Sequence, residues 1–187
     1  KRYLGKTDLS LNIFGTNQAE RLACVLKNEQ ISKIYSSSLQ RAIETANIIA
    51  EKNKAEVNRD SRLNEISFGK WEGLTFNEIS KNNPHFWDEW KNNLNFYCPP
   101  DGECLKELMD RVNDFIKKEL KKDETIAIVS HSGPIKIILL NALGSTIESF
   151  WKLKVDLGSI SIIDYNIDSS VVISINDVCH LGYMISV

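Results

Sequence analysis

The sequence has no long apolar run. A membrane-spanning helix needs roughly 18 consecutive apolar residues, and no stretch of this chain approaches that length. The most apolar segments are residues 135–140 and 160–163, which have the lengths of a buried helix segment and a buried strand. We therefore expect no membrane-spanning helix and no contact with a membrane.

An excess of charge of either sign is also missing. The chain has 23 lysine and arginine residues against 25 aspartate and glutamate residues, which gives a net charge of −2 at pH 7. Such a balance leaves no whole-molecule field that would attract nucleic acid or an acidic membrane. We expect no nucleic-acid partner, and any anionic ligand has to be captured by a local arrangement of donors.

Cysteine and histidine are few and widely spaced. The cysteines show no CxxC pair and the histidines lie far apart in the chain: Cys24, Cys98, Cys104 and Cys179, then His85, His131 and His180. Because zinc sites use paired ligands at short spacing, we expect no metal site, and we expect no other cofactor. We interpret the cysteines as reduced packing residues of a cytoplasmic protein.

The rest of the composition is that of an ordinary globular domain. Of 187 residues, 42 % are hydrophobic and 26 % are charged, which is close to the average for folded proteins. The length favours one domain, residues 1–187, over two small ones.

Helices and strands are predicted to alternate along the chain. One-sided apolar spacing, capping residues and short apolar runs indicate helices near 16–26, 39–50, 105–120 and 134–143, and a short helix that begins at Thr75. They indicate strands near 31–35, 57, 126–129, 159–165 and 171–175. We place the first helix cap at Thr16, and Thr75 with Glu78 forms a capping box. This pattern predicts a three-layer α/β/α sandwich with a mostly parallel central sheet and an antiparallel edge.

The segment from about 83 to 101 fits neither a regular helix nor a strand. It contains Trp87, Trp90, Pro99 and Pro100. We interpret it as an irregular aromatic insertion and a candidate lid or pocket wall.

A histidine and an arginine each come shortly after a strand that we predict to be parallel. His131 comes two residues after the strand 126–129, and Arg41 lies in the first turn of the helix that follows the strand 31–35. Ligands of open α/β sheets bind at the carboxyl ends of the strands, and a guanidinium can grip two phosphate oxygens. The ordinary alternatives are a hydrogen-bonded loop histidine and a solvated helix arginine.

An acidic residue lies in an aromatic loop. Glu65 is close in sequence to Phe68 and Trp71, and desolvation there would raise its pKa toward that of a useful proton donor. The alternative is a surface carboxylate. The residues alone thus predict an anion site that uses Arg41 and His131, with Glu65 as a nearby acid.

Several segments, taken together and in their order along the chain, resemble the histidine phosphatase superfamily, also called the phosphoglycerate mutase-like family. They are Tyr3-x-Gly5-x-x-Asp8 with the helix start after it, residues 36–46, Leu63-x-Glu65 with Gly69-x-Trp71-Glu72-Gly73, Pro100-Asp101-Gly102-Glu103, and Ser130-His131-Ser132-Gly133. The resemblance implies a phosphomonoesterase that works through a phosphohistidine intermediate without a metal, on a small-molecule phosphate monoester. It implies that Arg41 clamps the phosphoryl oxygens, that His131 stabilises their charge, and that Glu65 protonates the leaving alcohol and then activates water.

The same resemblance implies backbone roles for four further residues. Leu4 and Gly5 would contact the substrate through their backbone, and Ser132 and Gly133 would offer N–H groups at a helix start.

The family's Arg-His-Gly nucleophile motif lies on a first, central strand ahead of the segment that Tyr3 begins. The sequence begins at Lys1, and neither His85 nor His180 occurs in that motif's context. We expect the motif and its strand to precede Lys1, because losing a central strand would leave two neighbours unpaired. The alternative is a relative that binds a phosphate ligand without turnover.

By comparison with the family that it resembles, in which phosphoglycerate mutases usually carry a longer insertion, the stretch from Gly73 to Asp101 is short. The resemblance thus implies easier entry of water, which favours a phosphatase over a mutase. Trp87-x-x-Trp90 followed by the Pro99–Glu103 segment most resembles the α-ribazole phosphatase branch, which acts in assembly of the cobalamin nucleotide loop. The tryptophans would stack on a base or would serve as packing residues. The alternatives are broad action on sugar phosphates, phosphoserine or nucleotides, and phosphoglycerate mutase activity.

Overall fold

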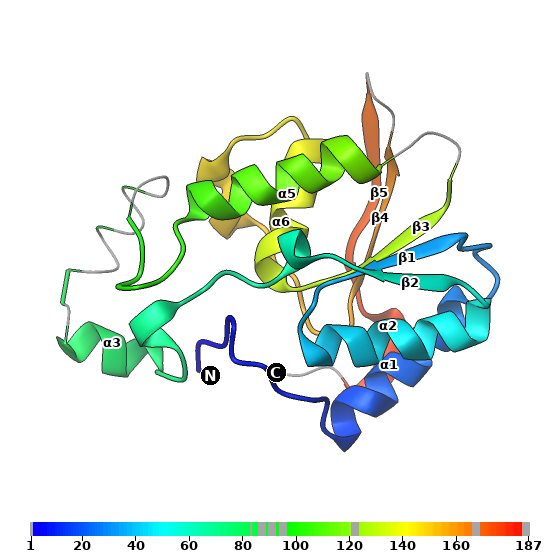
Figure 1. Ribbon diagram of the computed structural model, residues 1–187, viewed down its shortest axis with the longest axis horizontal. Coiled ribbons are helices and arrows are strands. Elements are labelled where there is room, and N and C mark those ends of the chain that lie inside the picture. The colour runs from blue at the N-terminus through cyan, green and yellow to red at the C-terminus, as the bar shows by residue number, and fades with distance from the viewer. Residues whose placement is uncertain are drawn as a thin grey trace.

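The computed structural model describes residues 2–82, 84–85, 89, 93, 97–120, 124–165 and 169–184. Its helices and strands alternate as predicted (Figure 1). They are α1 (Ile13–Leu26), β1 (Lys33–Ser36), α2 (Gln40–Asn53), β2 (Glu56–Arg59), α3 (Phe76–Asn82), α5 (Leu105–Glu119), β3 (Ile126–Val129), α6 (Ser132–Ala142), β4 (Ile160–Tyr165) and β5 (Ser170–Asp177). Short 3₁₀ turns cover Ser61–Leu63, Gly69–Trp71, Ile147–Lys152 and Cys179–Met184.

Three strands form a parallel sheet in the order β2-β1-β3. In its register Ile34 of β1 lies opposite Val57 of β2 and Ala127 of β3, so all three strands end at one edge. β4 and β5 pair antiparallel as a separate sheet. The predicted mostly parallel sheet with an antiparallel pair is confirmed, although no ladder joins β3 to β4 within the described ranges. The strand expected before Lys1 lies outside them.

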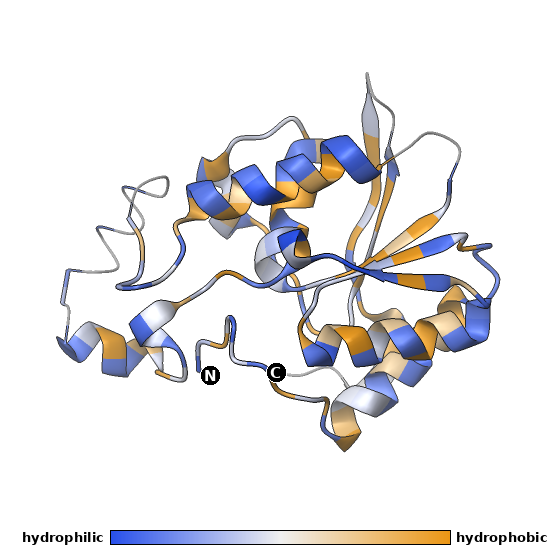
Figure 2. Ribbon diagram, viewed as in Figure 1, coloured by the Kyte–Doolittle hydropathy of each residue, from blue (hydrophilic) through white to orange (hydrophobic). Residues whose placement is uncertain are grey.

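Alternate residues of the strands face two different helix layers. Ile34 belongs to a buried cluster with residues of α1 and α2, such as Ala23 and Ile49. Tyr35 belongs to the opposite cluster, with Phe115 of α5 and Ile137 of α6. Figure 2 shows hydrophobic residues along the strands and alternating hydrophilic and hydrophobic residues around α5. The predicted three-layer arrangement is therefore confirmed.

The first helix starts one turn earlier than predicted. Its N-cap is Asn12, whose Oδ1 accepts the Gly15 N–H at 2.9 Å, and the Thr16 hydroxyl bonds to the carbonyl of Asn12 instead. The predicted capping box of α3 is confirmed, because Thr75 N–H donates to Glu78 at 2.7 Å and Glu78 N–H donates to the Thr75 hydroxyl at 3.2 Å.

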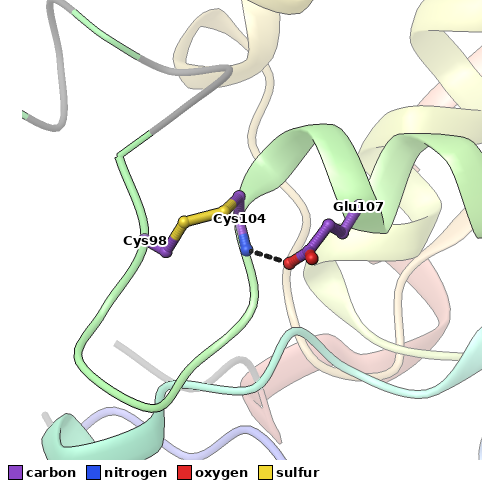
Figure 3. Close-up of a disulfide and its surroundings, with 3 residues drawn as sticks. All are labelled: Cys98, Cys104 and Glu107. Atoms are coloured by element: carbon purple, nitrogen blue, oxygen red, sulfur yellow. Dashed lines mark hydrogen bonds between the residues drawn. A yellow bond between two sulfur atoms is a disulfide. The ribbon is translucent and has the colours of Figure 1, made fainter.

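The prediction that all four cysteines are reduced packing residues is wrong. Cys98 and Cys104 form a disulfide next to the start of α5 (Figure 3), and the free Cys24 and Cys179 are exposed. A turn closed by the Gly102 N–H donating to the Pro99 carbonyl at 2.8 Å brings the pair together. Cysteine spacing alone does not reveal such a turn.

No helix in the described ranges is long and apolar enough to cross a membrane. Of the aromatic insertion, Trp87 and Trp90 lie outside those ranges, so its role as a lid stays a prediction.

Candidate functional site

The site is built at the carboxyl edge of the parallel sheet. His131 follows β3 and Ser37 follows β1, and the His131 Nε2 lies 2.8 Å from the Ser37 hydroxyl oxygen. Asn64 Oδ1 accepts the Ser38 N–H at 2.8 Å and the Ser37 hydroxyl at 2.9 Å. Because the only proton of that hydroxyl goes to Asn64, the imidazole Nε2–H must donate to Ser37. The hydrogen bonds of Ser37 and Asn64 therefore place the proton of the neutral His131 ring on Nε2.

The imidazole is held in its neutral form. Burial, together with the positive charges of Arg41 and Arg111, lowers the pKa of His131 to about 3. Burial disfavours the charged form of an imidazole, and nearby cations add to this effect. A dianionic ligand would oppose these charges and favour the protonated ring.

Glu65 is buried, with 9 % of the residue exposed. Its Oε1 accepts the Gly133 N–H at the start of α6 and its own neighbour's N–H, from Ile66, each at 3.0 Å. A Cβ at Gly133 would lie 2.4 Å from that oxygen, so the close approach requires glycine. Burial raises the pKa of Glu65, opposed by those two hydrogen bonds and by the charges of Arg41 and Arg111.

Arg41 projects from the first turn of α2 toward the N-terminal segment. Its Nη1 donates to the Thr7 carbonyl and its Nη2 to the Gly5 carbonyl, each at 2.9 Å. Burial lowers the pKa of Arg41, and the carboxylates of Glu65, Asp8 and Glu72 oppose this shift. The guanidinium keeps its charge, as arginine does in proteins.

Glu72 fastens the N-terminal loop, residues 4–8, and was not predicted as a site residue. Its carboxylate accepts backbone N–H groups from Gly5, Lys6, Thr7 and Phe68 and the Thr7 hydroxyl, at 2.6 to 3.3 Å. Burial raises the pKa of Glu72, but these bonds outweigh it and the pKa lies below its usual range. The only signal in the sequence is the acidic residue between Trp71 and Gly73.

The hydrogen bonds place the three predicted side chains around one edge of the sheet. Glu65 accepts the N–H of Gly133, two residues after His131. His131 bonds to Ser37, which lies four residues before Arg41 in the chain. Of the predicted backbone donors, the Gly5 N–H is used by Glu72 and the Gly133 N–H by Glu65. Leu4 is exposed and Ser132 is the first residue of α6. The predicted contacts of these residues with a substrate stay predictions.

A cavity of about 390 Å³ lies next to the N-terminal loop and α5, and Arg41, Glu65 and His131 are not among its lining residues. Its lining comes from the N-terminal loop, the loop of Glu65 and the segment before and inside α5: Lys6, Ser67, Asp101, Gly102, Glu103, Glu107 and Arg111. Within the described ranges no group of three or more histidine, cysteine, aspartate or glutamate side chains has the arrangement of a metal site. The polar lining suits a charged or hydrogen-bonding ligand.

Known proteins resemble this chain in sequence and in fold. The family described as histidine phosphatase superfamily (branch 1) matches residues 1–178. Phosphoserine phosphatase 1 of Hydrogenobacter thermophilus is 33 % identical over 97 % of this chain and 87 % of its own length. The adenosylcobalamin/alpha-ribazole phosphatase of Escherichia coli is 28 % identical over 88 % of this chain and 82 % of its own. The crystal structure of the alpha-ribazole phosphatase from Shigella flexneri superimposes with a TM-score of 0.84 at 28 % identity, over 94 % of this chain and 88 % of that one.

Proposed function

The chain belongs to branch 1 of the histidine phosphatase superfamily, and on that premise we propose that it hydrolyses small phosphate monoesters through a phosphohistidine intermediate. One observation carries the proposal. It is the hydrogen-bonded arrangement at the carboxyl edge of the sheet, where Glu65 binds the start of α6 beside His131, His131 binds Ser37 after β1, and Arg41 binds the Gly5 carbonyl.

Each side chain has a distinct task in this proposal. The Arg41 guanidinium exchanges its hydrogen bonds to the carbonyls of Thr7 and Gly5 for two phosphoryl oxygens. There it stabilises the negative charge that develops on these oxygens during phosphoryl transfer. The dianion raises the proton affinity of His131, whose second N–H then donates to a phosphoryl oxygen while Nε2 stays on Ser37.

The proton moves through Glu65. In the first step the phosphoryl group passes to a nucleophilic imidazole and the protonated Glu65 gives its proton to the leaving alcohol. In the second step a water attacks the phosphohistidine and the Glu65 carboxylate takes the water's proton, which releases inorganic phosphate. A raised pKa suits both steps, because a general acid–base works best near the operating pH.

The nucleophile is expected on the Arg-His-Gly segment that the family resemblance puts ahead of Tyr3. Intact-mass analysis and N-terminal sequencing of the native gene product test this expectation. A product without such a motif would favour the other class of function, a phosphate-binding module without turnover.

Two substrates are favoured by specific observations. α-Ribazole 5′-phosphate is favoured by the likeness to the Escherichia coli enzyme and the Shigella flexneri structure. O-Phosphoserine is favoured by the higher identity to the Hydrogenobacter protein over nearly the whole chain. Sugar phosphates, nucleotides and 3-phosphoglycerate complete the panel to be tested.

The decisive experiment is phosphate release from this panel by the full-length protein, with and without EDTA. We expect EDTA to have no effect, and we expect Arg41→Ala and His131→Ala to lower kcat by about a hundredfold or more, as loss of a preorganised donor does. Arg59→Ala and His85→Ala are matched controls, since both side chains are exposed. Normal rates in Arg41→Ala or His131→Ala would remove that residue from the site, and exchange of phosphate without release would indicate a mutase.

A further inference from the structure

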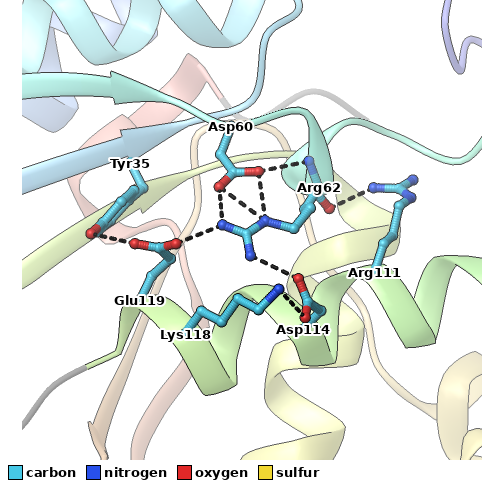
Figure 4. Close-up of polar contacts among 7 residues, drawn as sticks. All are labelled: Tyr35, Asp60, Arg62, Arg111, Asp114, Lys118 and Glu119. Carbon is cyan, nitrogen blue, oxygen red and sulfur yellow. Dashed lines mark hydrogen bonds and ion pairs between the residues drawn. The ribbon is translucent and has the colours of Figure 1, made fainter.

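The backbone of the acid loop, residues 63–73, is tied to α5 by an arginine that the proposed chemistry does not use. Arg111 donates through Nη1 to the Arg62 carbonyl at 2.6 Å and through Nη2 to the Glu65 carbonyl at 3.3 Å. Figure 4 shows the first of these bonds beside the Arg62 side chain. One guanidinium thus holds the entry of the loop and the backbone of its acidic residue.

The guanidinium is itself held by a carboxylate. Glu103 pairs with Arg111 through two bonds, Nε to Oε1 at 2.6 Å and Nη2 to Oε2 at 2.9 Å. The two side chains are 15 % and 21 % exposed, and such bidentate pairs are geometrically strict. Glu103 also joins Ser67 of the loop, since its N–H donates to the Ser67 carbonyl at 2.8 Å and its Oε2 accepts the Ser67 N–H at 3.3 Å.

A separate contact fixes the carboxylate end of Glu65. The Gly133 N–H of α6 binds Oε1 of that carboxylate, while Arg111 of α5 binds the backbone carbonyl of the same residue. The orientation of the Glu65 side chain therefore depends on both helices.

We propose that Arg111, locked by Glu103, is a positioning residue that sets the place of the Glu65 carboxylate from behind the acid loop. This role rests on the proposed function, in which Glu65 is the proton donor. Arg111 has no direct bond to that carboxylate in the structure, and its effect is exerted through the backbone and through its charge.

The ionisation of Glu65 reports on this arrangement. The charged groups that act on it are Arg41 from α2, Arg111 from α5 and Lys136 from α6. The neutral imidazole of His131 lies two residues before Gly133, whose N–H binds the carboxylate. Removing the positive charge of Arg111 moves the Glu65 titration to higher pH. Removing the negative charge of Glu103 leaves Arg111 unpaired and moves the titration to lower pH.

The opposite directions of these two shifts distinguish a positioning role of Arg111 from a general loss of packing. Loosened packing alone would hydrate Glu65 in both variants and move its titration in one common direction. Arg111→Lys keeps the charge but loses the bidentate geometry, so it tests placement without a change of charge.

The experiment uses the full-length protein and four variants: Arg111→Gln, Arg111→Lys, Glu103→Gln and, as a control, Lys106→Gln. Lys106 also lies on α5 but pairs with Asp110 at the surface. Two readouts are measured, the pH profile of kcat and KM for phosphate release, and the titration of ¹³C-labelled Glu65 by NMR.

We expect Arg111→Gln to lower kcat by about tenfold to a hundredfold, as a misplaced catalytic group does, with a smaller change in KM. In Arg111→Gln, the alkaline limb of the pH profile of kcat and the titration of Glu65 both move to higher pH. In Glu103→Gln, both move to lower pH. In Arg111→Lys, both stay in place although kcat falls. Lys106→Gln changes nothing.

The proposal is overturned if Arg111→Gln and Glu103→Gln move the Glu65 titration in the same direction or not at all. If Arg111→Gln does not fold, Arg111→Lys and Glu103→Gln decide by the same criteria. The NMR titration needs no turnover, so absence of phosphate release from the wild-type protein would overturn the proposed function and leave this readout intact.

Discussion

Burial of the Glu65 carboxyl group lowers the stability of the fold at neutral pH, and the same burial gives this group the raised pKa that the proposed proton transfer needs. Its carboxylate is buried and accepts two backbone N–H groups, yet burial still raises its pKa. In the folded protein this group therefore holds its proton at pH values where the unfolded chain has lost it, and stability falls as pH rises through that range.

We expect Glu65→Gln to abolish turnover and to stabilise the fold relative to wild type at pH 8. The glutamine oxygen can still accept the Gly133 N–H, and the uncharged side chain removes the penalty for a buried anion. Thermal unfolding at pH 4 and pH 8 checks this, and the advantage of the variant should grow toward pH 8. Glu20→Gln is the control, because Glu20 is an exposed residue of α1. An equal difference between Glu65→Gln and wild type at both pH values would contradict the raised pKa.

Some candidate site residues can be proposed from the sequence and others cannot, for a physical reason. Arg41 and His131 follow strands, and Glu65 lies in an aromatic loop, so their positions make them candidates. Glu72 and Arg111 act through backbone groups distant in the sequence, and their partners become visible only when the loops are folded.

Among the elements, the start of α5 combines a disulfide with a helix cap. Cys104 precedes the helix, is joined to Cys98, and donates its N–H to Glu107 at 2.9 Å (Figure 3). The turn between the two cysteines carries Glu103, which holds Arg111. The disulfide therefore restrains the chain that reaches the acid loop.

Reduction or Cys98→Ser should lower the stability of the fold. A disulfide that closes so short a loop contributes about 2 kcal/mol in the chain-entropy account, which is a fall in Tm of about 4–8 °C for a domain of this size. Thermal unfolding with and without dithiothreitol measures this. Cys24→Ser, which removes a free exposed thiol, should respond to reductant as the wild type does. A wild-type Tm that dithiothreitol leaves unchanged would contradict the prediction.

Most elements were predictable because their periodicity and caps are local. The stripe of α5 and the apolar run of β3 predict their bounds closely. The start of α1 was missed because Asn12 and Thr16 are both good caps, and the choice between them depends on the surrounding chain. For instance, Glu44 of α2 accepts the N–H of Leu11 at 2.7 Å just before the helix.

For the whole molecule, the charge balance determines how a ligand is captured. A net charge of −2 offers an anion no long-range attraction, so in the proposed function the binding energy for an anion comes from Arg41, His131 and their surroundings. Ligands that bind only the folded state raise its stability by mass action.

Vanadate or inorganic phosphate at a hundred times its Kd should add about 2.7 kcal/mol, which raises Tm by about 5–11 °C for a domain of this size. Arg41→Ala should lose this shift, and Arg59→Ala should keep it. Differential scanning calorimetry over a range of ligand concentrations makes the comparison. An equal shift in both variants would mean that the anion binds elsewhere.

The layered fold as a whole was predictable from the order of helices and strands. The order and register of the strands were not, because strand pairing joins residues that are distant in the sequence. The residues of β3 are half-buried, whereas its apolar sequence alone indicates burial on both faces.

The carboxylate of Glu72 joins stretches of chain that are 67 residues apart at Gly5. Because several N–H groups of one stretch converge on a single side chain of the other, opening either stretch breaks the same set of hydrogen bonds. We therefore expect the two to open together as one cooperative unit of local unfolding. A ligand that orders the stretch around Gly5 would therefore order the stretch around Glu72 as well. Both stretches would then lose their conformational entropy in the same binding step.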